Sequence, residues 1–388
     1  MRRTVIVFLI DAFGWDLQET RPFLAEHVHR RPLKTILGFS SAAIPTLLTG
    51  KHPDEHGRWF LYRRSRSDSP FGFAGLLAPF ARGPLAAFVR AAYEKCFDHF
   101  TNITGYYHLY RVPLGLLPRF DLPEKRPVYL PGGVDGAPTL FDRIEEAGIP
   151  SRVWFWRTRE EDNFGEILAA VREGEETFLF FYASELDALM HARGTDAPET
   201  RGLMDSYEAR IRETLGEAEK RADEVELYVC SDHGMVDVKR IIDLMGDIRS
   251  LPFREGKDYL PFYDSTFARF WFFSGAAEKA IRDRLENAAG GRLLGDDELH
   301  RLRVLFPDRE YGEAVFVTGA GTVIAPSFMG DRAPAAMHGY HPDDPGSDGL
   351  VISNRPLPER DLSIRDMAAL LEGAARRAAE DEGHGERP

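Results

Sequence analysis

The stretch VELYVCSDHGM (residues 225–235) joins an almost continuous apolar run to an adjacent carboxylate and imidazole, Asp232 and His233. Apolar runs of this length, rich in β-branched and aromatic residues, are typical of strands in parallel sheets, which helices cover on both faces. An ionised carboxylate at the buried end of such a strand costs several kcal/mol unless a partner charge balances it. The stretch therefore predicts an α/β fold with a metal ion at the tip of a central strand.

Five further apolar runs have the same strand-like character. Between several of them lie segments whose apolar residues recur at helical spacing. Strands that alternate with helices imply a mostly parallel central sheet sandwiched by helices. The expected strands are TVIVFLI (4–10), RVWFW (152–156), TFLFFYA (177–183), ARFWFF (268–273) and GLVIS (349–353), and the expected helices include 138–149, 163–174 and 199–224.

The chain of 388 residues is longer than a typical domain, but one large α/β domain with insertions accounts for that length. We expect a single domain over residues 1–380, with cap insertions at about 58–135 and 245–330 and a flexible tail at 381–388. Both insertions interrupt the alternation of strands and helices. Because α/β proteins bind ligands in loops at the carboxyl ends of their strands, the insertions are expected to shape a substrate pocket.

Composition argues against several classes of protein. The hydrophobic fraction of 43% and the charged fraction of 29% are ordinary for a globular chain, which excludes disorder and coiled coil. A net charge of -13 argues against stable binding to nucleic acid or to an anionic membrane surface, although a local basic patch could hold a phosphate. No stretch approaches the roughly 20 apolar residues of a membrane span.

The N-terminal stretch MRRTVIVFLID begins like a signal peptide, since two arginines precede an apolar run. That run is short and β-branched and has no small-residue cleavage site, so we interpret it as a strand. Two cysteines, Cys96 and Cys230, are too few for a disulfide framework and fit a reducing compartment. A cytoplasmic location is therefore expected.

Aspartate and histidine residues recur where the expected strands end. The segment SELDALMH follows the strand at 177–183 and places Asp187 and His191 four residues apart, on one side of a helical turn. Taken singly, such an aspartate is more often a helix cap, and such a pair is more often a solvated helix face. Six oxygen and nitrogen ligands at the strand ends of one sheet suit two divalent ions, zinc or alternatively manganese. The six residues are Asp11, Asp187, His191, Asp232, His233 and His338.

The stretch GFSSAAIPTLLTG (38–50) offers a nucleophile. It has the pattern of a loop that enters the N-terminus of a short helix, where backbone N–H groups and the helix dipole favour an anion. A serine at this position is ordinarily only an N-cap. Between two segments of metal ligands it becomes a candidate nucleophile, because coordination to a metal makes an alkoxide attainable at neutral pH.

The order of these motifs resembles the alkaline phosphatase superfamily, and most closely its nucleotide pyrophosphatase/phosphodiesterase branch, the type I phosphodiesterases. The segments that carry the resemblance are FLIDAFGWD, FSSAAIPTLLTGKHPDEHG, SELDALMHARG with CSDHGM, and MHGYHPDD, and they extend from near residue 4 to about residue 353. The resemblance implies an α/β sandwich in which two zinc ions hold the phosphate while a Ser or Thr is phosphorylated transiently. The resemblance to sulfatases is weaker. Their nucleophile is followed by x-Pro-x-Arg, whereas Ser40 is followed by SAAI.

Carried over by motif, the resemblance assigns roles to these residues. Ser40 would be the nucleophile, because the family's nucleophile lies ten residues before the glycine of a Thr-Gly motif, here Thr49-Gly50. Ser41 is the alternative. One metal would be bound by Asp187, His191 and His338, and the other by Asp11, Ser40, Asp232 and His233.

The expected substrate pocket departs from the family's pattern. The branch usually has an asparagine about twenty residues beyond the nucleophile, where this chain has Leu61 in RWFLYRR. An asparagine from elsewhere in the chain could supply the donor, or an arginine could replace it, since a guanidinium binds phosphate oxygens in a bidentate manner. A solvated basic run and, for the aromatic residues, a small core within the insertion fit the sequence equally well. The candidate substrate-binding residues are Trp59, Tyr62, Arg63 and Arg64, with Phe60, Tyr106 and Tyr107 as further stacking surfaces.

The sequence thus predicts a metal-dependent hydrolase of a small phosphate ester, with a phosphodiester or nucleotide substrate and a phosphoserine intermediate. A phosphomonoesterase or a phosphomutase would share every ligand, and a non-catalytic metal-stabilised binding protein is an alternative from another class. The segment DSTFARFW (264–271), with Asp264 and Arg269, lies in the second insertion and could face the substrate, although the sequence supplies no physical argument for it.

Overall fold

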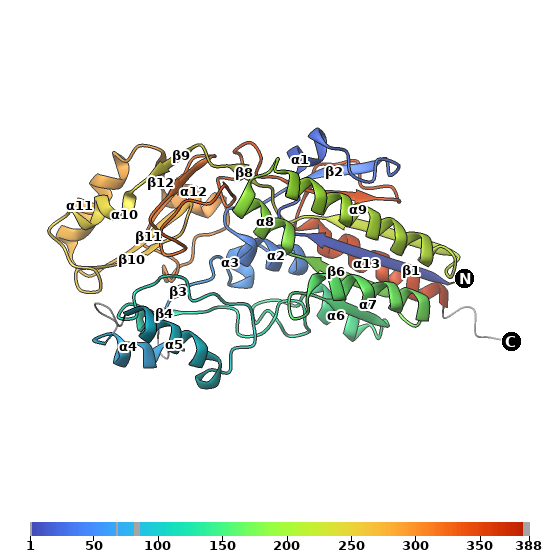
Figure 1. Cartoon of the computed structure of the whole chain (residues 1–388), viewed down its shortest axis with the longest axis horizontal. Helices are drawn as coiled ribbons and strands as arrows, with labels where there is room; N and C mark the ends of the chain where they lie inside the picture. The colour runs from blue at the N-terminus through green and yellow to red at the C-terminus, as the bar shows by residue number, and fades with distance from the viewer. Residues whose placement is uncertain (1, 67–68, 81–85, 383–388) are drawn as a thin grey trace.

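A seven-stranded sheet forms the centre of the protein (Figure 1). The computed structural model describes residues 2–66, 69–80 and 86–382. The strand order is β17-β2-β16-β7-β1-β6-β5; β5, β6, β1 and β7 run parallel, whereas β16 is antiparallel to both of its neighbours. The predicted α/β fold with a mostly parallel central sheet is confirmed. The strands are β1 (Arg3–Ile10), β2 (His29–Lys34), β5 (Ser151–Trp154), β6 (Phe178–Ala183), β7 (Glu224–Cys230), β16 (Gly349–Ser353) and β17 (Leu362–Ser363).

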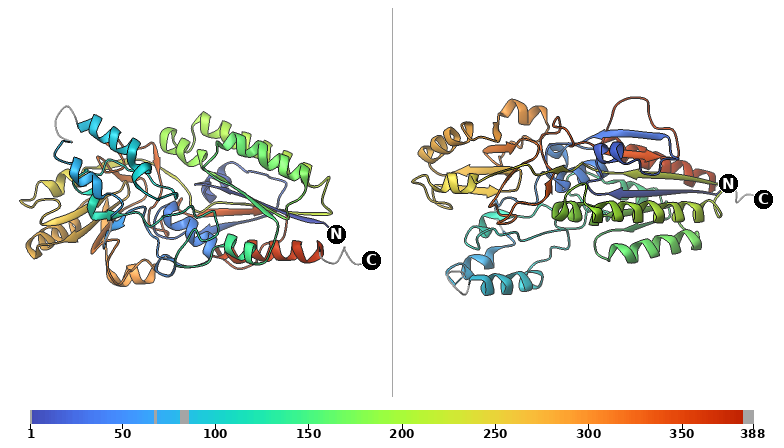
Figure 2. Two further views of the ribbon diagram at one scale, coloured as in Figure 1. Left: turned by 90° about the horizontal axis from the view of Figure 1, so that it is seen from below. Right: turned by 45° about the horizontal axis from the view of Figure 1, so that its top comes forward.

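The strand β1 shows why the sheet is covered on both faces. Its successive side chains point to opposite faces, and Ile6, Val7, Phe8 and Leu9 are all fully buried. Val7 and Leu9 pack with helices α2, α6 and α13, whereas Ile6 and Phe8 pack with α7 and α9. Figure 2 shows helices on both sides of the sheet. These helices are α2 (Ser40–Thr49), α6 (Leu140–Glu146), α7 (Glu160–Glu173), α9 (Pro198–Ala218) and α13 (Asp366–Glu382).

The two insertions pack together beside the sheet, and we call residues 58–135 and 245–330 the cap lobe (left in Figure 1). Tyr62 and Phe71 of the first insertion share one hydrophobic cluster with Phe262 and Trp271 of the second. The run 268–273 is a strand as expected, β11 (Phe267–Phe272), but it belongs to a separate antiparallel sheet of order β10-β11-β13-β12. The other elements of this region are β3 (Arg63–Arg64), α4 (Gly72–Leu77), α5 (Ala86–Phe100), the 3-10 helix η2 (Leu117–Arg119), β4 (Phe120–Asp121), α10 (Leu244–Arg249), β10 (Tyr259–Tyr263), α11 (Gly275–Glu286), β12 (Gly291–Leu294), α12 (Asp296–Arg301) and β13 (Ala314–Thr318).

The remaining elements are short. They are α1 (Trp15–Thr20), α3 (Pro53–His56), α8 (Glu185–Arg193), β8 (Val236–Asp237) paired with β15 (Ala336–Met337), and β9 (Arg240–Ile242) paired with β14 (Thr322–Ile324). Of the expected tail at 381–388, the first two residues are still helical, and 383–388 lie outside the described residues.

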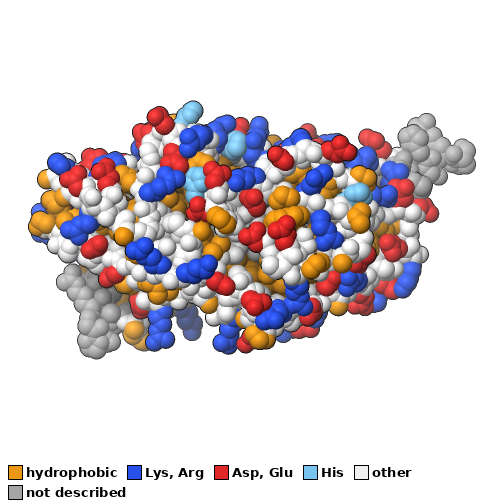
Figure 3. All heavy atoms as spheres, turned by 90° about the horizontal axis from the view of Figure 1, so that it is seen from above, with side chains coloured by type: hydrophobic (Ala, Val, Ile, Leu, Met, Phe, Trp, Pro, Cys, Tyr) orange, Lys and Arg blue, Asp and Glu red, His pale blue; other side chains and the backbone are white. Residues whose placement is uncertain are grey.

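Within the described residues, no helix is both long and apolar enough to span a membrane. On the face shown in Figure 3, Lys and Arg side chains are interspersed with Asp and Glu. This face therefore offers no extended basic surface of the kind that binds nucleic acid. Cys96 is exposed and Cys230 is buried, and both are free thiols.

Candidate metal centre

The candidate ligands converge at the carboxyl ends of three neighbouring strands, β6, β1 and β7. Asp11 directly follows β1, Asp232 and His233 follow β7, and α8, which begins just after β6, carries Asp187. Because these strands are parallel, their carboxyl ends open at the same edge of the sheet. His338 arrives from a distant part of the chain, directly after β15.

We call Asp11, Asp232 and His233 the buried cluster. The Nε2 atom of His233 lies 3.4 Å from Oδ1 of Asp11 and 3.3 Å from Oδ2 of Asp232. Its Nδ1 atom donates a hydrogen bond of 3.0 Å to the carbonyl of Gly234, so Nε2 is the ring atom that faces the carboxylates. Tyr182 donates a hydrogen bond to the other oxygen of Asp11, which orients this carboxylate from behind.

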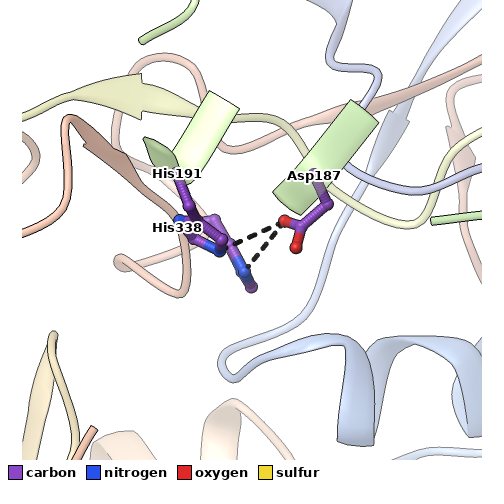
Figure 4. A group of neighbouring side chains, drawn as sticks. All are labelled: Asp187, His191 and His338. Atoms are coloured by element: carbon purple, nitrogen blue, oxygen red, sulfur yellow. Dashed lines mark ion pairs between the residues drawn. The ribbon is translucent and has the colours of Figure 1, made fainter. Parts of the chain in front are cut away.

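We call Asp187, His191 and His338 the α8 cluster, and Figure 4 shows both imidazoles beside the one carboxylate. Oδ1 of Asp187 lies 3.3 Å from Nε2 of His191 and 3.4 Å from Nε2 of His338. Nδ1 of His191 donates to the carbonyl of Ala336 at 2.8 Å, which is how histidine ligands are commonly oriented. The rings of His338 and His233 stack with their centroids 3.9 Å apart, so the two clusters are adjacent.

The two clusters differ in their ionisation. Burial and the neighbouring Asp232 raise the pKa of Asp11 well above its usual value, and burial raises the pKa of Asp232 to about 7. In the α8 cluster, burial works to lower the pKa of His191, but the Asp187 carboxylate outweighs it and raises this pKa to about 9. The raised pKa values show that the buried cluster disfavours two ionised carboxylates unless a cation is bound there.

The residues of both clusters fit divalent metal ions. In the described part of the chain, both carboxylate oxygens of Asp232, Oδ1 of Asp187 and Nδ1 of His338 are buried without a hydrogen-bond partner. Buried polar atoms nearly always have one, so these atoms point to a missing ligand. The oxygen-to-nitrogen separations of 3.3 Å and 3.4 Å match the edge, about 3.3 Å, of a tetrahedron with metal–ligand distances of about 2.0 Å. Mixed oxygen and nitrogen ligands at such separations suit zinc and other first-row dications.

Ser40, the first residue of α2, lies beside the buried cluster. Its Oγ atom is 2.9 Å from Nε2 of His233 and 3.4 Å from Oδ1 of Asp11. The hydroxyl of Ser41 instead donates to the carbonyl of Trp59 at 3.3 Å. The geometry therefore distinguishes two serines that are neighbours in the sequence, and Ser40 is the one that contacts the cluster.

A cavity of about 360 Å³ opens onto Ser40 and both clusters. Its wall combines aromatic rings with two further carboxylates from the cap lobe. Among the described residues that line it, none is a lysine, an arginine or an asparagine. The lining residues include Leu61, Tyr106, Glu124, Tyr129, Trp156 and Asp264.

Residues 120–266 match the family model described as type I phosphodiesterase / nucleotide pyrophosphatase. The resemblance to this family is confirmed. A comparison with curated proteins finds no match.

Solved structures of similar fold align with nearly the whole chain. Murine ectonucleotide pyrophosphatase / phosphodiesterase 5, as an inactive form in complex with AMP, superposes with a TM-score of 0.66 at 16% identity, over 96% of this chain and 95% of that one. The human protein superposes with a TM-score of 0.66 at 13% identity, with the same coverage of both chains. Phosphonoacetate hydrolase from Sinorhizobium meliloti, in complex with phosphonoformate, gives 0.65 at 16% identity over 96% of both chains. At these identities the likeness establishes the fold.

Two aromatic residues expected at the substrate lie in the core instead. Trp59 is 1% exposed and donates its indole N–H to the carbonyl of Leu37 at 2.8 Å. Tyr62 is fully buried, and its hydroxyl donates to the carbonyl of His108 at 2.9 Å. Both side chains are therefore structural, which is the alternative that the sequence left open. Tyr106, in contrast, does line the cavity.

The two arginines expected to replace the phosphodiesterase asparagine also lie outside the cavity. Arg63 forms a 3.0 Å ion pair with Asp121, and Arg64 lies 3.5 Å from Glu313. Carboxylates of the cap lobe thus neutralise both guanidinium groups, and neither is free to bind phosphate. Leu61, near the family's asparagine position, presents an apolar side chain to the cavity. The expected arginine replacement is not supported.

Sequence patterns alone did not identify two polar residues of the site, Tyr182 and Glu124. Tyr182 reaches Asp11 because the parallel register of β1 and β6 pairs it with Leu9. Glu124 lies in an irregular loop of the first insertion, where no periodicity distinguishes it. Asp264 was noticed in the sequence, but only the folded cap lobe brings it to the cavity wall.

Proposed function

We propose that the protein hydrolyses phosphodiesters at a site that holds two divalent metal ions, zinc or alternatively manganese, with Ser40 as the nucleophile. The family match supports hydrolysis of a phosphate ester. Proteins of similar fold have been solved in complex with AMP and with phosphonoformate, both of them small phosphorus-containing ligands. The observation that carries the proposal is the position of Ser40. It is the first residue of α2, and its Oγ atom lies 2.9 Å from Nε2 of His233.

The site residues divide between the two ions as the motifs suggest. The buried cluster together with Ser40 would hold one ion, and the α8 cluster would hold the other. When bound, the ions would neutralise phosphate oxygens and lower the pKa of the Ser40 hydroxyl. His191 and His233 keep their Nε2 atoms available for this role, because each ring donates its Nδ1 proton to a backbone carbonyl.

Ser40 attacks phosphorus in line with the departing ester oxygen. A bond forms between Oγ and phosphorus, the bond from phosphorus to the ester oxygen breaks, and the alcohol leaves. A water molecule then attacks the phosphoserine, which releases a phosphate monoester and restores the Ser40 hydroxyl. One diester and one water are consumed, and one monoester and one alcohol are formed.

The N-terminus of α2 orients the phosphate for this attack. The first N–H groups of a helix have no partner within the helix, and the helix dipole favours an anion there. The residue before α2, Phe39, has no polar side chain to cap them. The N–H groups of Ser40 and Ser41 are therefore available to phosphate oxygens, whereas those of Ala42 and Ala43 already donate to the carbonyl of Phe39.

A phosphodiester suits the cavity better than a phosphomonoester. A monoester carries a second negative charge, and the described cavity wall offers neither lysine nor arginine to balance it. With zinc or manganese supplied, bis-p-nitrophenyl phosphate should be hydrolysed faster than p-nitrophenyl phosphate. The reverse order would favour a phosphomonoesterase, and hydrolysis of neither ester would favour the non-catalytic binding protein.

The nucleophile is tested by Ser40→Ala. Its turnover of bis-p-nitrophenyl phosphate should fall by at least about a thousandfold, while the metal content stays near that of the unaltered protein. Ser41→Ala is the matched control and should retain most of the activity, because the Ser41 hydroxyl contacts a backbone carbonyl. Full activity of Ser40→Ala would refute the assignment.

A further inference from the structure

The cavity wall opposite the metal clusters includes a carboxylate that the proposed chemistry does not use. Glu124 is 8% exposed, and its Oε1 accepts a hydrogen bond of 2.9 Å from the backbone N–H of Tyr106. Its Oε2 lies 3.6 Å from Nη1 of Arg58, which is itself buried. A Cβ atom at Gly105 would come within 2.6 Å of Glu124, so the adjoining loop packs directly against this side chain. Glu124 is thus held in place and lines the cavity.

A second carboxylate, Asp264, reaches the same cavity from the other insertion. Its Oδ2 accepts a 3.1 Å hydrogen bond from Nε of Arg269, a fully buried side chain. The guanidinium lies between the rings of Phe60 and Phe262, at 4.0 Å and 4.8 Å from their centroids. Arg269 is therefore fixed behind Asp264 and does not line the cavity.

Glu124 and Asp264 are held in the same way. In each case a buried arginine stabilises the carboxylate from the protein side and leaves the carboxylate, rather than the guanidinium, in the cavity wall. A carboxylate offers up to four acceptor sites and no donor when ionised, so what it binds must carry hydrogen-bond donors or positive charge.

Aromatic rings share the cavity wall with Glu124. Tyr106 and Trp156 both line the cavity and meet edge to face, with ring centroids 5.9 Å apart. Tyr106 is 47% exposed and so lies toward the cavity mouth. Tyr129, also in the wall, stacks on Tyr182 with a centroid separation of 4.8 Å. Aromatic faces next to a carboxylate are the surroundings that bind ammonium groups, through the ring quadrupole and the opposite charge.

The same wall is unfavourable to a second anionic group. A nucleoside triphosphate or a carboxylated substrate carries negative charge beyond the phosphate under attack. Among the described lining residues no lysine or arginine is available to balance it, and Glu124 and Asp264 would repel it.

Resting on the proposed phosphodiesterase activity, we propose that the substrate is a phosphodiester with one ester group that carries a positively charged amine, bound by Glu124, Tyr106 and Trp156. Asp264 adds negative potential from the facing insertion. The preferred substrate is therefore an ammonium-bearing diester rather than a nucleoside polyphosphate.

Two diesters that differ only in charge test this inference. With the metal-loaded protein, we compare p-nitrophenyl phosphorylcholine with p-nitrophenyl 3,3-dimethylbutyl phosphate, in which carbon replaces the quaternary nitrogen. The value of kcat/KM should be about tenfold higher for the cationic ester. A ratio of one or below would overturn the inference while leaving the phosphodiesterase activity intact. Hydrolysis of neither ester would overturn the proposed function, and the inference with it.

Variants test which residues produce the preference for the cationic ester. Glu124→Gln should bring the ratio toward one, because the amide keeps the shape of the carboxylate but loses its charge. Tyr106→Leu, at a partly exposed position, should lower the ratio without loss of folding. The exposed Glu146→Gln is the control and should keep it. A ratio unchanged in both Glu124→Gln and Tyr106→Leu would overturn the assigned site.

A nucleotide ester supplies the last arm of the test. The p-nitrophenyl ester of thymidine 5′-monophosphate should be a poorer substrate than p-nitrophenyl phosphorylcholine. A higher kcat/KM for the thymidine ester would overturn the inference and assign the aromatic wall to a nucleobase instead.

Discussion

The buried cluster and the α8 cluster contain the same ligand types but stand in different surroundings. Asp232, in the buried cluster, is fully buried at the end of a central strand, whereas His191 on α8 keeps 25% of its side chain exposed. The buried cluster has two carboxylates and one imidazole, and the α8 cluster has one carboxylate and two imidazoles. Without an ion, burial raises the pKa of both carboxyl groups in the first, while in the second Asp187 pairs with the imidazole whose pKa it raises, His191.

The difference indicates unequal dependence on metal. Ionised carboxylates crowded at the end of a buried strand are stabilised by a bound cation, and without one burial favours their protonated forms. A partly exposed helix can balance its own charges and admit water. We therefore expect metal binding to stabilise the fold mainly through the buried cluster.

The strongest test of this comparison substitutes one carboxylate in each cluster. Asp232→Asn and Asp187→Asn should each lower turnover by at least about a hundredfold, because even residues behind metal ligands can cost that much. In a chelator their effects on thermal unfolding should have opposite signs. Above pH 7, where the Asp232 carboxylate is ionised, Asp232→Asn should raise the melting temperature by removing an unpartnered buried charge, and Asp187→Asn should lower it by breaking the pair with His191.

Thermal melts of both variants with and without chelator provide the measurement. Equal shifts of the melting temperature in chelator would contradict the proposed asymmetry. Added zinc should raise the melting temperature of the unaltered protein by mass action.

A smaller effect is expected from Glu160, which anchors α8. Its Oε2 accepts hydrogen bonds from the backbone N–H groups of Ser184 at 2.8 Å and Glu185 at 3.1 Å, where the helix begins. Glu160→Gln should weaken metal binding to the α8 cluster about tenfold and spare the buried cluster. A competition titration with a metal-binding dye should show that only one of two sites is weakened. Glu161→Gln, at an exposed neighbour, is the control, and equal weakening of both sites would refute the anchoring role.

The smallest expected effect concerns the pH dependence of the free energy of unfolding, through a histidine that lies outside both clusters. His56 is 2% exposed, and burial lowers its pKa to about 3. Between pH 6.5 and 3 the unfolded chain binds a proton that the folded chain excludes, so the free energy of unfolding falls as pH falls. This group should account for about 1 kcal/mol of the loss between pH 7 and 5.5.

Urea unfolding of His56→Gln at those two pH values, in chelator, checks this expectation. The variant should lose about 1 kcal/mol less than the unaltered protein. The exposed His300→Gln is the control and should behave like the unaltered protein. An unchanged pH dependence in His56→Gln would contradict the role of burial.

Local sequence patterns predicted the strands whose hydrophobicity is continuous, and β1, β5, β6 and β7 all lie where the runs indicate. They missed β2, because HRRPLK is polar and contains a proline, so only its place between β16 and β17 makes it a strand. The antiparallel direction of β16 and the separate sheet of β11 were also not predicted, since pairing depends on partners far away in the chain. Trp59 and Tyr62 were misplaced for the same reason, because aromatic residues suit a core as well as a pocket.

The sequence by itself determined the chemistry that this chain can support. Residue types at strand ends and the order of the motifs identified the six candidate ligands and Ser40, because parallel strands bring their carboxyl ends to one edge. Only the tertiary structure decided which side chains face the substrate. Glu124 and Asp264 enter the cavity from two insertions that pack against each other, and no local pattern in either insertion encodes where the other will lie.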